Sequence, residues 1–445
     1  MTQEMTTLPA FDRRSVLGGF GVSALLAGIP QSVLARTLRQ DPPTFPGLTK
    51  IINDYVAEKK VSGMLAAIGF GQSDPQVIAA GAQAIGSERI VDVNTLWRLY
   101  SQTKPVTGMA VMMLIEDGKL TMDQPLSDIL PEFANMQVLM DPNGPIEDTE
   151  PAKIEITIRH LLTHTAGLGY SIISKGPILK AYLANGITPG VVSRMPIPGF
   201  EGGAPTPDAK TFSKNLASLP LVYQPGAKWS YSVSLDLLSY VVEVASGLPL
   251  DKFLQARMFD PLGMKDSFFQ LPADRVGDFA TNYAPFAGAL IPIDPAETSI
   301  YLDKPAFAFG GAGMISSAAD YDKFLKMLLG FGTSGGVTIM KPETAKLGMS
   351  NLLPEGAEVK GSWVVNQGFG AGGRVGLGTP LSPAGTYGWG GAAGTSAFVD
   401  TVRGLRAGGY TQYMPSNTYP FQSDFPKYVY ADLTGETVID GGKTS

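Results

Sequence analysis

Short apolar stretches bounded by turn residues predict strands near both ends of the chain. Near the N-terminus two such stretches, residues 64–70 and 76–80, are separated by a turn with glycine and proline, the pattern of a β-hairpin. The last quarter of the chain has four more stretches, punctuated by glycine: residues 369–376, 387–390, 395–400 and 405–413. Strands at both ends predict a sheet that the two ends build together.

The residues between these ends have helical periodicity instead. After Trp97, apolar residues recur at the i, i+3, i+4 and i+7 spacing of an amphipathic helix, which ends at Asp117. Thr157 is a predicted N-cap for a helix over residues 158–165. Further helices are predicted over residues 49–60, 231–246 and 425–433 and directly after Ser317.

This arrangement predicts an α/β (α+β) fold: an antiparallel sheet built from both chain ends and flanked by helices, with an inserted, mostly helical subdomain. We expect a single domain over residues 36–445. Its sheet would come from about residues 45–100 and 355–440, and its helical part from about residues 101–350. Residues 142–151 and 176–210 are poorly patterned insertions, and the second is a candidate loop over a substrate.

The first residues predict an export signal. Arg13 and Arg14 precede a moderately apolar run over residues 16–29, and residues 33–35 resemble a small-residue cleavage site. The arginine pair favours the twin-arginine route for residues 1–35, so we expect an exported, periplasmic protein with no stable membrane insertion after signal removal. An uncleaved anchor and a cytoplasmic tail are the alternatives.

Composition excludes several kinds of chemistry. The sequence has no cysteine and two histidines, His160 and His164, so cysteine nucleophiles, disulfides and cysteine-based metal sites are excluded. The two histidines lack the H-E-x-x-H pattern and a third ligand, which predicts a structural role, no metal and no cofactor. The net charge of −6 and the lack of a basic cluster argue against a nucleic-acid partner.

Ser101 and Lys104 form the only S-x-x-K sequence in the chain, at the start of a predicted helix. Residues three apart on a helix share a face, with about 5–6 Å between their Cβ atoms, so the lysine nitrogen can reach the serine oxygen. A lysine that loses its hydration has a lowered pKa and can take the serine proton, which activates the serine without a histidine. The pattern is weak alone, because a chain of this length contains about one by chance.

Two other motif matches are not expected to be functional. Residues 332–336 fit G-x-S-x-G, but they follow a predicted helix, whereas a nucleophile elbow lies between a strand and a helix. Residues 368–373 fit G-x-G-x-x-G, but no helix begins there to bind a pyrophosphate. We interpret the second match as a glycine-rich strand.

Further segments follow Ser101 in an informative order. One places Tyr231 at the entry of a predicted helix, and another contains glycines that would let a ligand lie against a strand. In chain order the segments are residues 101–104, 160–168, 225–232, 310–317 and 388–391. Their order resembles the serine β-lactamase-like superfamily, nearest to class C β-lactamases and family VIII carboxylesterases. The resemblance extends from about residue 45 to 435 and implies that the single domain is a catalytic one.

The resemblance implies a role for each matching residue. Ser101 would be the acylated nucleophile, and Lys104 and Tyr231 would share its proton and pass it to the leaving group. The sequence leaves open which of the two is the base. The backbone N–H groups of Ser101 and Ala392 would form the oxyanion hole.

Two departures from the family pattern bear on the substrate. Trp389, followed by Gly390 and Gly391, stands where β-lactamases have the lysine that holds a substrate carboxylate. Val233 stands where they have the asparagine that binds an acylamino group. We expect these four residues to border the substrate, and a tryptophan there favours a neutral, apolar group. Arg403 or Arg406 would be an alternative source of the missing cation.

The sequence therefore predicts a serine esterase that hydrolyses neutral carboxylic esters of small to medium size through an acyl-enzyme on Ser101. A β-lactamase or D-Ala-D-Ala peptidase, an amidase or acyl transferase using the same site, and a non-catalytic scaffold are the alternatives. A small-molecule ester is the expected partner, and the oligomeric state stays open.

Overall fold

The computed structural model describes residues 43–190, 192–195, 205–379 and 382–436, together with the backbone of two short C-terminal strands, β17 (Val438–Ile439) and β18 (Lys443–Thr444). The predicted export signal lies outside these residues. Within them, no helix has both the length and the apolar character needed to cross a bilayer.

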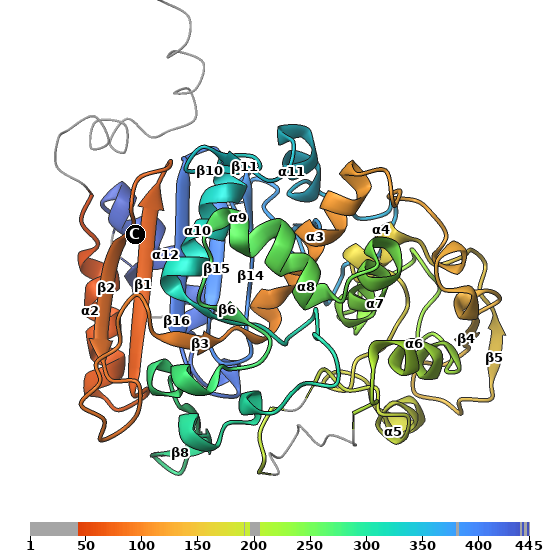
Figure 1. Cartoon of the computed structure of the whole chain (residues 1–445), viewed down its shortest axis with the longest axis horizontal. Coiled ribbons are helices and arrows are strands. Elements are labelled where there is room, and N and C mark those ends of the chain that lie inside the picture. The colour runs from red at the N-terminus through yellow and green to blue at the C-terminus, as the bar shows by residue number, and fades with distance from the viewer. Residues whose placement is uncertain are drawn as a thin grey trace, which may run out of the picture.

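Both chain ends contribute strands to one seven-stranded antiparallel sheet (Figure 1). Its spatial order is β12-β13-β14-β15-β16-β1-β2, so an N-terminal and a C-terminal strand meet at the β16–β1 pair. The bounds are β1 (Gly63–Phe70), β2 (Gln76–Gly81), β12 (Gly368–Phe369), β13 (Arg374–Val375), β14 (Thr386–Gly390), β15 (Ser396–Asp400) and β16 (Leu405–Thr411). The expected antiparallel sheet from both ends is confirmed.

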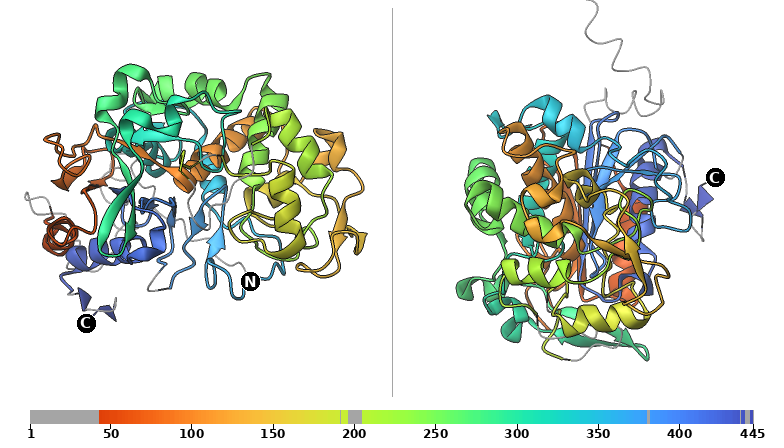
Figure 2. Two further views of the ribbon diagram at one scale, coloured as in Figure 1. Left: turned by 90° about the horizontal axis from the view of Figure 1, so that it is seen from below. Right: turned by 90° about the vertical axis from the view of Figure 1, so that its right-hand side faces the viewer.

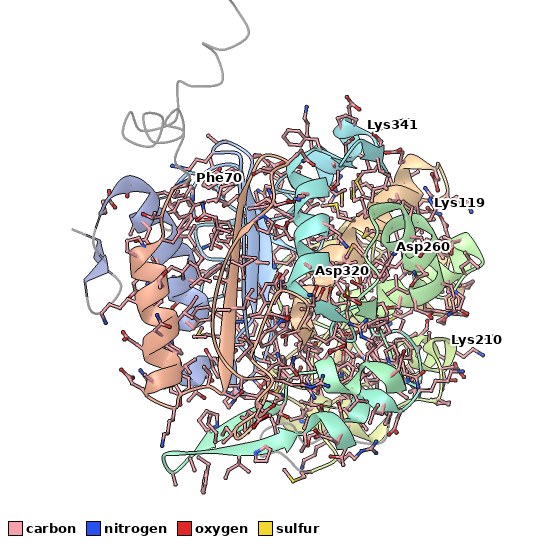
Figure 3. The ribbon with its side chains drawn as sticks, turned by 60° about the vertical axis from the view of Figure 1, so that its left-hand side comes forward. Phe70, Lys119, Lys210, Asp260, Asp320 and Lys341 are labelled. Carbon is pink, nitrogen blue, oxygen red and sulfur yellow. The ribbon has the colours of Figure 1, made fainter. Side chains whose placement is uncertain are left out.

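Helices cover both faces of this sheet. Alternation along β1 sends Met64, Ala66 and Ile68 into a core shared with α2 (Pro46–Ala57) and α12 (Phe421–Thr434), while Leu65 and Ala67 join a larger core on the other face. On that other face α10 (Ala318–Leu329) packs against β15 and β16. Figure 3 shows α2 and α10 on opposite sides of the sheet. Ser317 caps α10 as predicted, accepting a hydrogen bond from the N–H of Asp320.

The inserted helical region lies to one side of the sheet, opposite α2 (Figure 2). Its helices are α3 (Lys104–Glu116), α4 (Ile158–Leu162), α5 (Gly176–Ala184), α6 (Ala209–Ala217), α7 (Ser234–Ser246), α8 (Leu250–Leu254), α9 (Asp260–Leu262) and α11 (Pro342–Gly348). The predicted amphipathic character of α3 is wrong: residues 104–114 are all buried, because α7, α11 and β14 pack around it. Polar residues of α3 are therefore enclosed in the protein interior.

Short strand pairs join these layers. They are β3 (Leu96–Arg98), β6 (Ser267–Phe268) and β9 (Ile315–Ser317) in one sheet, and the pairs β4 (Gln137–Leu139) with β5 (Thr149–Pro151), β7 (Asn282–Phe286) with β8 (Ala289–Asp294), and β10 (Thr333–Ser334) with β11 (Val337–Thr338). Residues 332–336 enter β10 from the end of α10, so they form no strand-to-helix elbow.

Two predicted segments differ from the structure. Residues 369–376 form two short strands instead of one, because Gly372 adopts a φ of +74° in a tight turn between β12 and β13. Residues 176–210, predicted to be an irregular loop, contain α5 and the start of α6, while residue 191 and residues 196–204 lie outside the described part of the chain.

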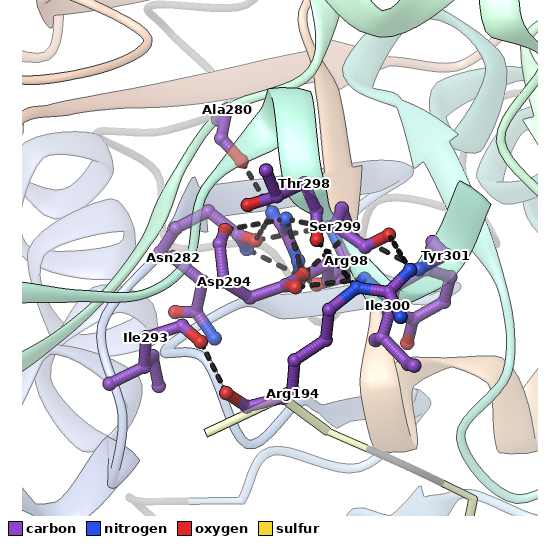
Figure 4. Close-up of polar contacts among 12 residues, drawn as sticks. Arg98, Arg194, Ala280, Asn282, Ile293, Asp294, Thr298, Ser299, Ile300 and Tyr301 are labelled. Carbon is purple, nitrogen blue, oxygen red and sulfur yellow. Dashed lines mark hydrogen bonds and ion pairs between the residues drawn. The ribbon is translucent and has the colours of Figure 1, made fainter. Parts of the chain in front are cut away.

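A buried ion pair fixes β3, the strand that leads into Ser101 (Figure 4). The Arg98 guanidinium donates to Asp294 Oδ2 from Nε at 2.7 Å and to the Asp294 carbonyl oxygen at 2.9 Å. It also donates to the carbonyl oxygen of Ala280, and both charged side chains are buried. These partners tie β3 to the end of β8, so the backbone that precedes Ser101 is rigidly placed.

Candidate active site

Ser101 lies in a 3-10 turn, η1 (Tyr100–Thr103), that leads directly into α3. Tyr100 has a φ of +43°, unusual for a residue with a side chain, and so turns the chain sharply just before the serine. Nζ of Lys104, in the first turn of α3, donates to Ser101 Oγ at 3.2 Å. The spacing of the S-x-x-K sequence therefore brings these two groups together.

The Lys104 side chain is fully buried. Its Nζ donates a second hydrogen bond to the carbonyl oxygen of Gly311 at 2.8 Å, and it lies 4.5 Å from the centre of the Tyr231 ring and 5.5 Å from that of Tyr170. Among the described residues no carboxylate lies within ion-pairing distance of Lys104. Its nitrogen is thus held by neutral groups next to the serine.

Tyr231 lies three residues before α7, so the prediction that it begins that helix is wrong. Neighbouring backbone is held by two hydrogen bonds, from Ser230 N–H to His164 O at 2.9 Å and from Val233 N–H to Gly169 O at 3.1 Å. The Tyr231 hydroxyl accepts a hydrogen bond from Nε1–H of Trp389 at 3.3 Å. That contact leaves the hydroxyl proton free to be donated elsewhere.

The end of β14 packs against the backbone next to Ser101. A Cβ atom on Gly391 would lie 2.1 Å from the carbonyl oxygen of Leu99, so glycine is required where these two backbones meet. Ala392, half-buried, follows at once. The segment that carries the predicted second oxyanion donor is thereby brought next to the turn that carries Ser101.

The residues expected to border the substrate differ in burial. A Cβ atom on Gly390 would meet the Gln422 side chain at 2.8 Å, and Gly390 lines a cavity of about 140 Å³ together with Trp389 and Arg374. Val233 is fully buried and has no surface to offer a ligand. Trp389 is also largely buried, against Tyr231 and Phe369.

Neither arginine proposed as a substitute cation is available. The buried Arg406 donates to Asp322 Oδ1 at 2.7 Å and to two backbone carbonyls, and Arg403 pairs with Asp400 at 2.9 Å. Arg374 is the cation near this region instead. Its guanidinium lies 5.0 Å from the centre of the Trp389 ring, and no acidic partner is found in the described part of the chain.

Both histidines occupy structural positions. His160 completes a capping box with Thr157 at the start of α4, accepting from the Thr157 N–H on Nδ1 at 3.1 Å, and burial lowers its pKa to about 4. His164 Nδ1 lies 2.9 Å from Ser232 Oγ and its ring packs 4.8 Å from the Tyr231 ring. Burial, with a contribution from Lys104, holds the pKa of His164 well below its usual value. The described residues contain no group of acids and histidines that fits a metal ion.

A cavity of about 230 Å³ is lined by Tyr100 and Ala312, the sequence neighbours of Ser101 and Gly311, and Ser101, Lys104 and Tyr231 are not in its lining. Its other walls are mainly apolar and aromatic, with Tyr301, Phe307 and Phe309 among them. Such a lining accommodates an apolar group and offers it few hydrogen bonds.

The beta-lactamase family model matches residues 48–424. The chain belongs to the beta-lactamase family. Esterase EstB of Burkholderia gladioli is 32% identical over 387 residues, which cover 80% of this chain and 88% of EstB.

Two solved structures of this fold are similar over nearly the whole chain. EstCE1, described as a hydrolase with promiscuous acyltransferase activity, has a TM-score of 0.70 and 25% identity, covering 91% of this chain and 99% of EstCE1. A mutant of simvastatin synthase from Aspergillus terreus has a TM-score of 0.70 and 25% identity, covering 92% of this chain and 100% of that protein. The superfamily inferred from the ordered motifs is confirmed, and this family member is a serine hydrolase-type enzyme with esterase and acyltransferase relatives.

Sequence reasoning missed residues that surround the family's motifs in this chain. Trp363 lies 4.9 Å from the Tyr231 ring, and Tyr170 lies 5.2 Å from it. Asp236 accepts a hydrogen bond from the Gly311 N–H at 2.9 Å. The only signal for Trp363 was a tryptophan in a glycine-rich, polar segment, and the only signal for Asp236 was an acid near the start of a mainly apolar helix.

Proposed function

We propose that the protein is a serine esterase that hydrolyses neutral carboxylic esters through an acyl-enzyme on Ser101. The observation that carries this proposal is the position of Lys104 Nζ, 3.2 Å from Ser101 Oγ and beneath the Tyr231 ring, with no carboxylate paired to it among the described residues. A serine hydrogen-bonded to a buried amine, with a tyrosine ring packed against that amine, is an arrangement suited to nucleophilic catalysis without histidine.

The reaction proceeds in two balanced steps. Ser101 Oγ forms a bond to the ester carbonyl carbon, its proton passes to the Lys104–Tyr231 pair, and that pair protonates the departing alkoxide as the ester C–O bond breaks. Water then attacks the acyl-enzyme, gives a proton to the same pair, and releases the acid as Ser101 is reprotonated. The N–H groups of Ser101 and Ala392 stabilise the oxyanion, and one such donor contributes about 3–4 kcal/mol to the transition state.

Two features favour a neutral substrate with an apolar acyl group. The family's carboxylate-binding lysine is replaced by Trp389, and the cavity beside Tyr100 is lined mainly by apolar and aromatic residues. The esterase relatives support ester hydrolysis as the reaction.

The test incubates the purified protein with p-nitrophenyl acetate, butyrate and octanoate and, in parallel, with a chromogenic cephalosporin. Ester hydrolysis should exceed cephalosporin hydrolysis. Ser101→Ala should abolish it with an unchanged Tm, and a phosphonate ester should label the peptide that contains Ser101. Labelling at Ser334 would contradict the assignment.

A further inference from the structure

Trp363 differs from the other tryptophans of the chain in being exposed. Trp97, Trp229 and Trp389 are buried, whereas 53% of Trp363 is accessible to solvent. Its ring nevertheless lies 4.9 Å from the Tyr231 ring at an interplanar angle of 51°. One part of the indole therefore packs on the tyrosine, and a large part of it remains available to another molecule.

The loop that carries Trp363 is anchored at both ends. Its first part pairs with the segment that precedes Tyr231, through Glu358 N–H to Ala227 O at 2.8 Å and Trp229 N–H to Glu358 O at 2.9 Å. Directly after Trp363, Val364 is fully buried in the main core. These attachments hold the indole over Tyr231. Less conformational entropy of the loop is therefore lost when a ligand binds to the indole.

The position of Tyr231 indicates which part of a substrate meets Trp363. The leaving oxygen of the ester must reach the Lys104–Tyr231 pair to be protonated, so the alcohol group lies at Tyr231. The cavity of about 230 Å³ is built from other elements, among them Tyr100 and residues of the 300–313 segment, and neither Tyr231 nor Trp363 lines it. Trp363 therefore lies next to the part of the site that would hold the alcohol group of the ester.

We propose that Trp363 is a specificity-determining residue that binds the alcohol group of the ester by stacking and selects aromatic alcohols over saturated ones. The proposal rests on the proposed ester hydrolysis. An exposed indole face next to the proton relay offers a planar ring an offset-stacked or edge-to-face contact that a saturated ring of the same size makes less well.

The test compares benzyl acetate with cyclohexylmethyl acetate. Both form the same acetyl-enzyme, so any difference in kcat/KM arises before the alcohol departs. Wild type should favour the benzyl ester by about threefold to tenfold, in keeping with the strength of aromatic pairs. Trp363→Ala should bring the ratio close to one, mainly through KM for the benzyl ester, and Trp363→Phe should keep most of the preference.

Val365→Ala is the matched control, because Val365 is 46% exposed on the same loop. It should leave the ratio as in wild type. A wild-type ratio near one, or an equal ratio in wild type and Trp363→Ala, would overturn the proposal while leaving ester hydrolysis intact.

A second measurement does not depend on turnover. Because Trp363 is the exposed tryptophan, acrylamide should quench its fluorescence selectively, and benzyl alcohol should protect it at lower concentration than cyclohexylmethanol. If neither ester is hydrolysed, the proposed function fails for these substrates, and the quenching alone decides the role of Trp363. Equal protection by both alcohols, or protection that persists in Trp363→Ala, would overturn the proposed role of Trp363.

Discussion

Lys104 and Asp236 bind the two backbone polar groups of one residue, Gly311. Lys104 Nζ donates to the carbonyl oxygen of Gly311 at 2.8 Å, and the N–H of Gly311 donates to Asp236 Oδ1 at 2.9 Å. A Cβ atom on Gly311 would lie 2.5 Å from Asp236 Oδ2, so only glycine fits between the two side chains. The buried lysine and the buried carboxyl are thereby linked without an ion pair.

This link predicts a pH-dependent stability that Asp236 controls. Burial raises the pKa of Asp236 from 3.8 to about 6, although Lys104 and the Gly311 N–H act in the opposite direction. Between these pH values the folded protein retains a proton that the unfolded chain has lost. The stabilising contribution is therefore full below about pH 4 and is lost as pH rises through about 6.

Asp236→Asn should remove this dependence while keeping the acceptor for Gly311. Between pH 4 and 7 the free energy of unfolding of wild type should fall by about 3 kcal/mol relative to the variant, measured by urea denaturation at each pH. Asp274→Asn, which alters an exposed carboxyl, is the control and should follow wild type. Parallel curves for wild type and Asp236→Asn would contradict the prediction.

His160 gives a prediction of opposite sign. Burial lowers its pKa from 6.5 to about 4, so the neutral ring is favoured in the folded state. Its contribution is present above about pH 6.5 and is lost as pH falls through about 4. Between pH 6.5 and 4, the free energy of unfolding of His160→Gln should therefore fall by up to about 3 kcal/mol less than that of wild type. Urea denaturation at each pH measures this difference.

Glutamine also suits the N3 position of the capping box, so His160→Gln should cost little stability at pH 7, and His160→Ala should cost about 1 kcal/mol. Ester hydrolysis should persist in the folded variants, and EDTA should not reduce it. A rate loss of about four decades in a well-folded His160 variant would instead indicate catalysis by imidazole.

The architecture was predictable where the hydrophobic pattern is local. Short apolar or glycine-punctuated stretches identified the strands of the sheet, and Thr157 and Ser317 identified two helix starts. Burial on every side was not predictable for α3, because its periodic apolar residues are the same whether one face or all faces are covered. That difference depends on helices distant in the sequence.

The candidate site was predictable in part, for a similar reason. Ser101 and Lys104 meet because helical spacing is local, and ordered motifs placed Tyr231 near them. The environment of Arg406 and the position of Trp363 over Tyr231 depend on chain segments far apart in the sequence. Neither leaves a local pattern from which it could be inferred.

The contact between Trp389 and Tyr231 predicts a loss of rate in Trp389→Phe. Phenylalanine keeps an aromatic ring but lacks the N–H that donates to the Tyr231 hydroxyl at 3.3 Å. A hydrogen bond of this kind contributes about 0.5–1.5 kcal/mol, so kcat/KM for neutral esters should fall by about twofold to tenfold. Steady-state kinetics with p-nitrophenyl butyrate measure it, and an unchanged value would show that the hydrogen bond does not orient the tyrosine.

Trp389→Lys tests substrate charge. It places a cation where related enzymes hold a carboxylate, so kcat/KM for an anionic cephalosporin should rise relative to p-nitrophenyl butyrate by roughly tenfold, equivalent to about 1.4 kcal/mol. Loss of the indole's apolar contact should raise KM for the neutral ester more than it lowers kcat. Trp389→Phe is the control, since it removes the indole without adding charge and should leave cephalosporin hydrolysis low.

Efficient cephalosporin hydrolysis by wild type, with no response to Trp389→Lys, would favour the β-lactamase alternative. Since Arg403 and Arg406 are occupied by carboxylates, the cation responsible would then be sought at Arg374, and Arg374→Ala should abolish that activity.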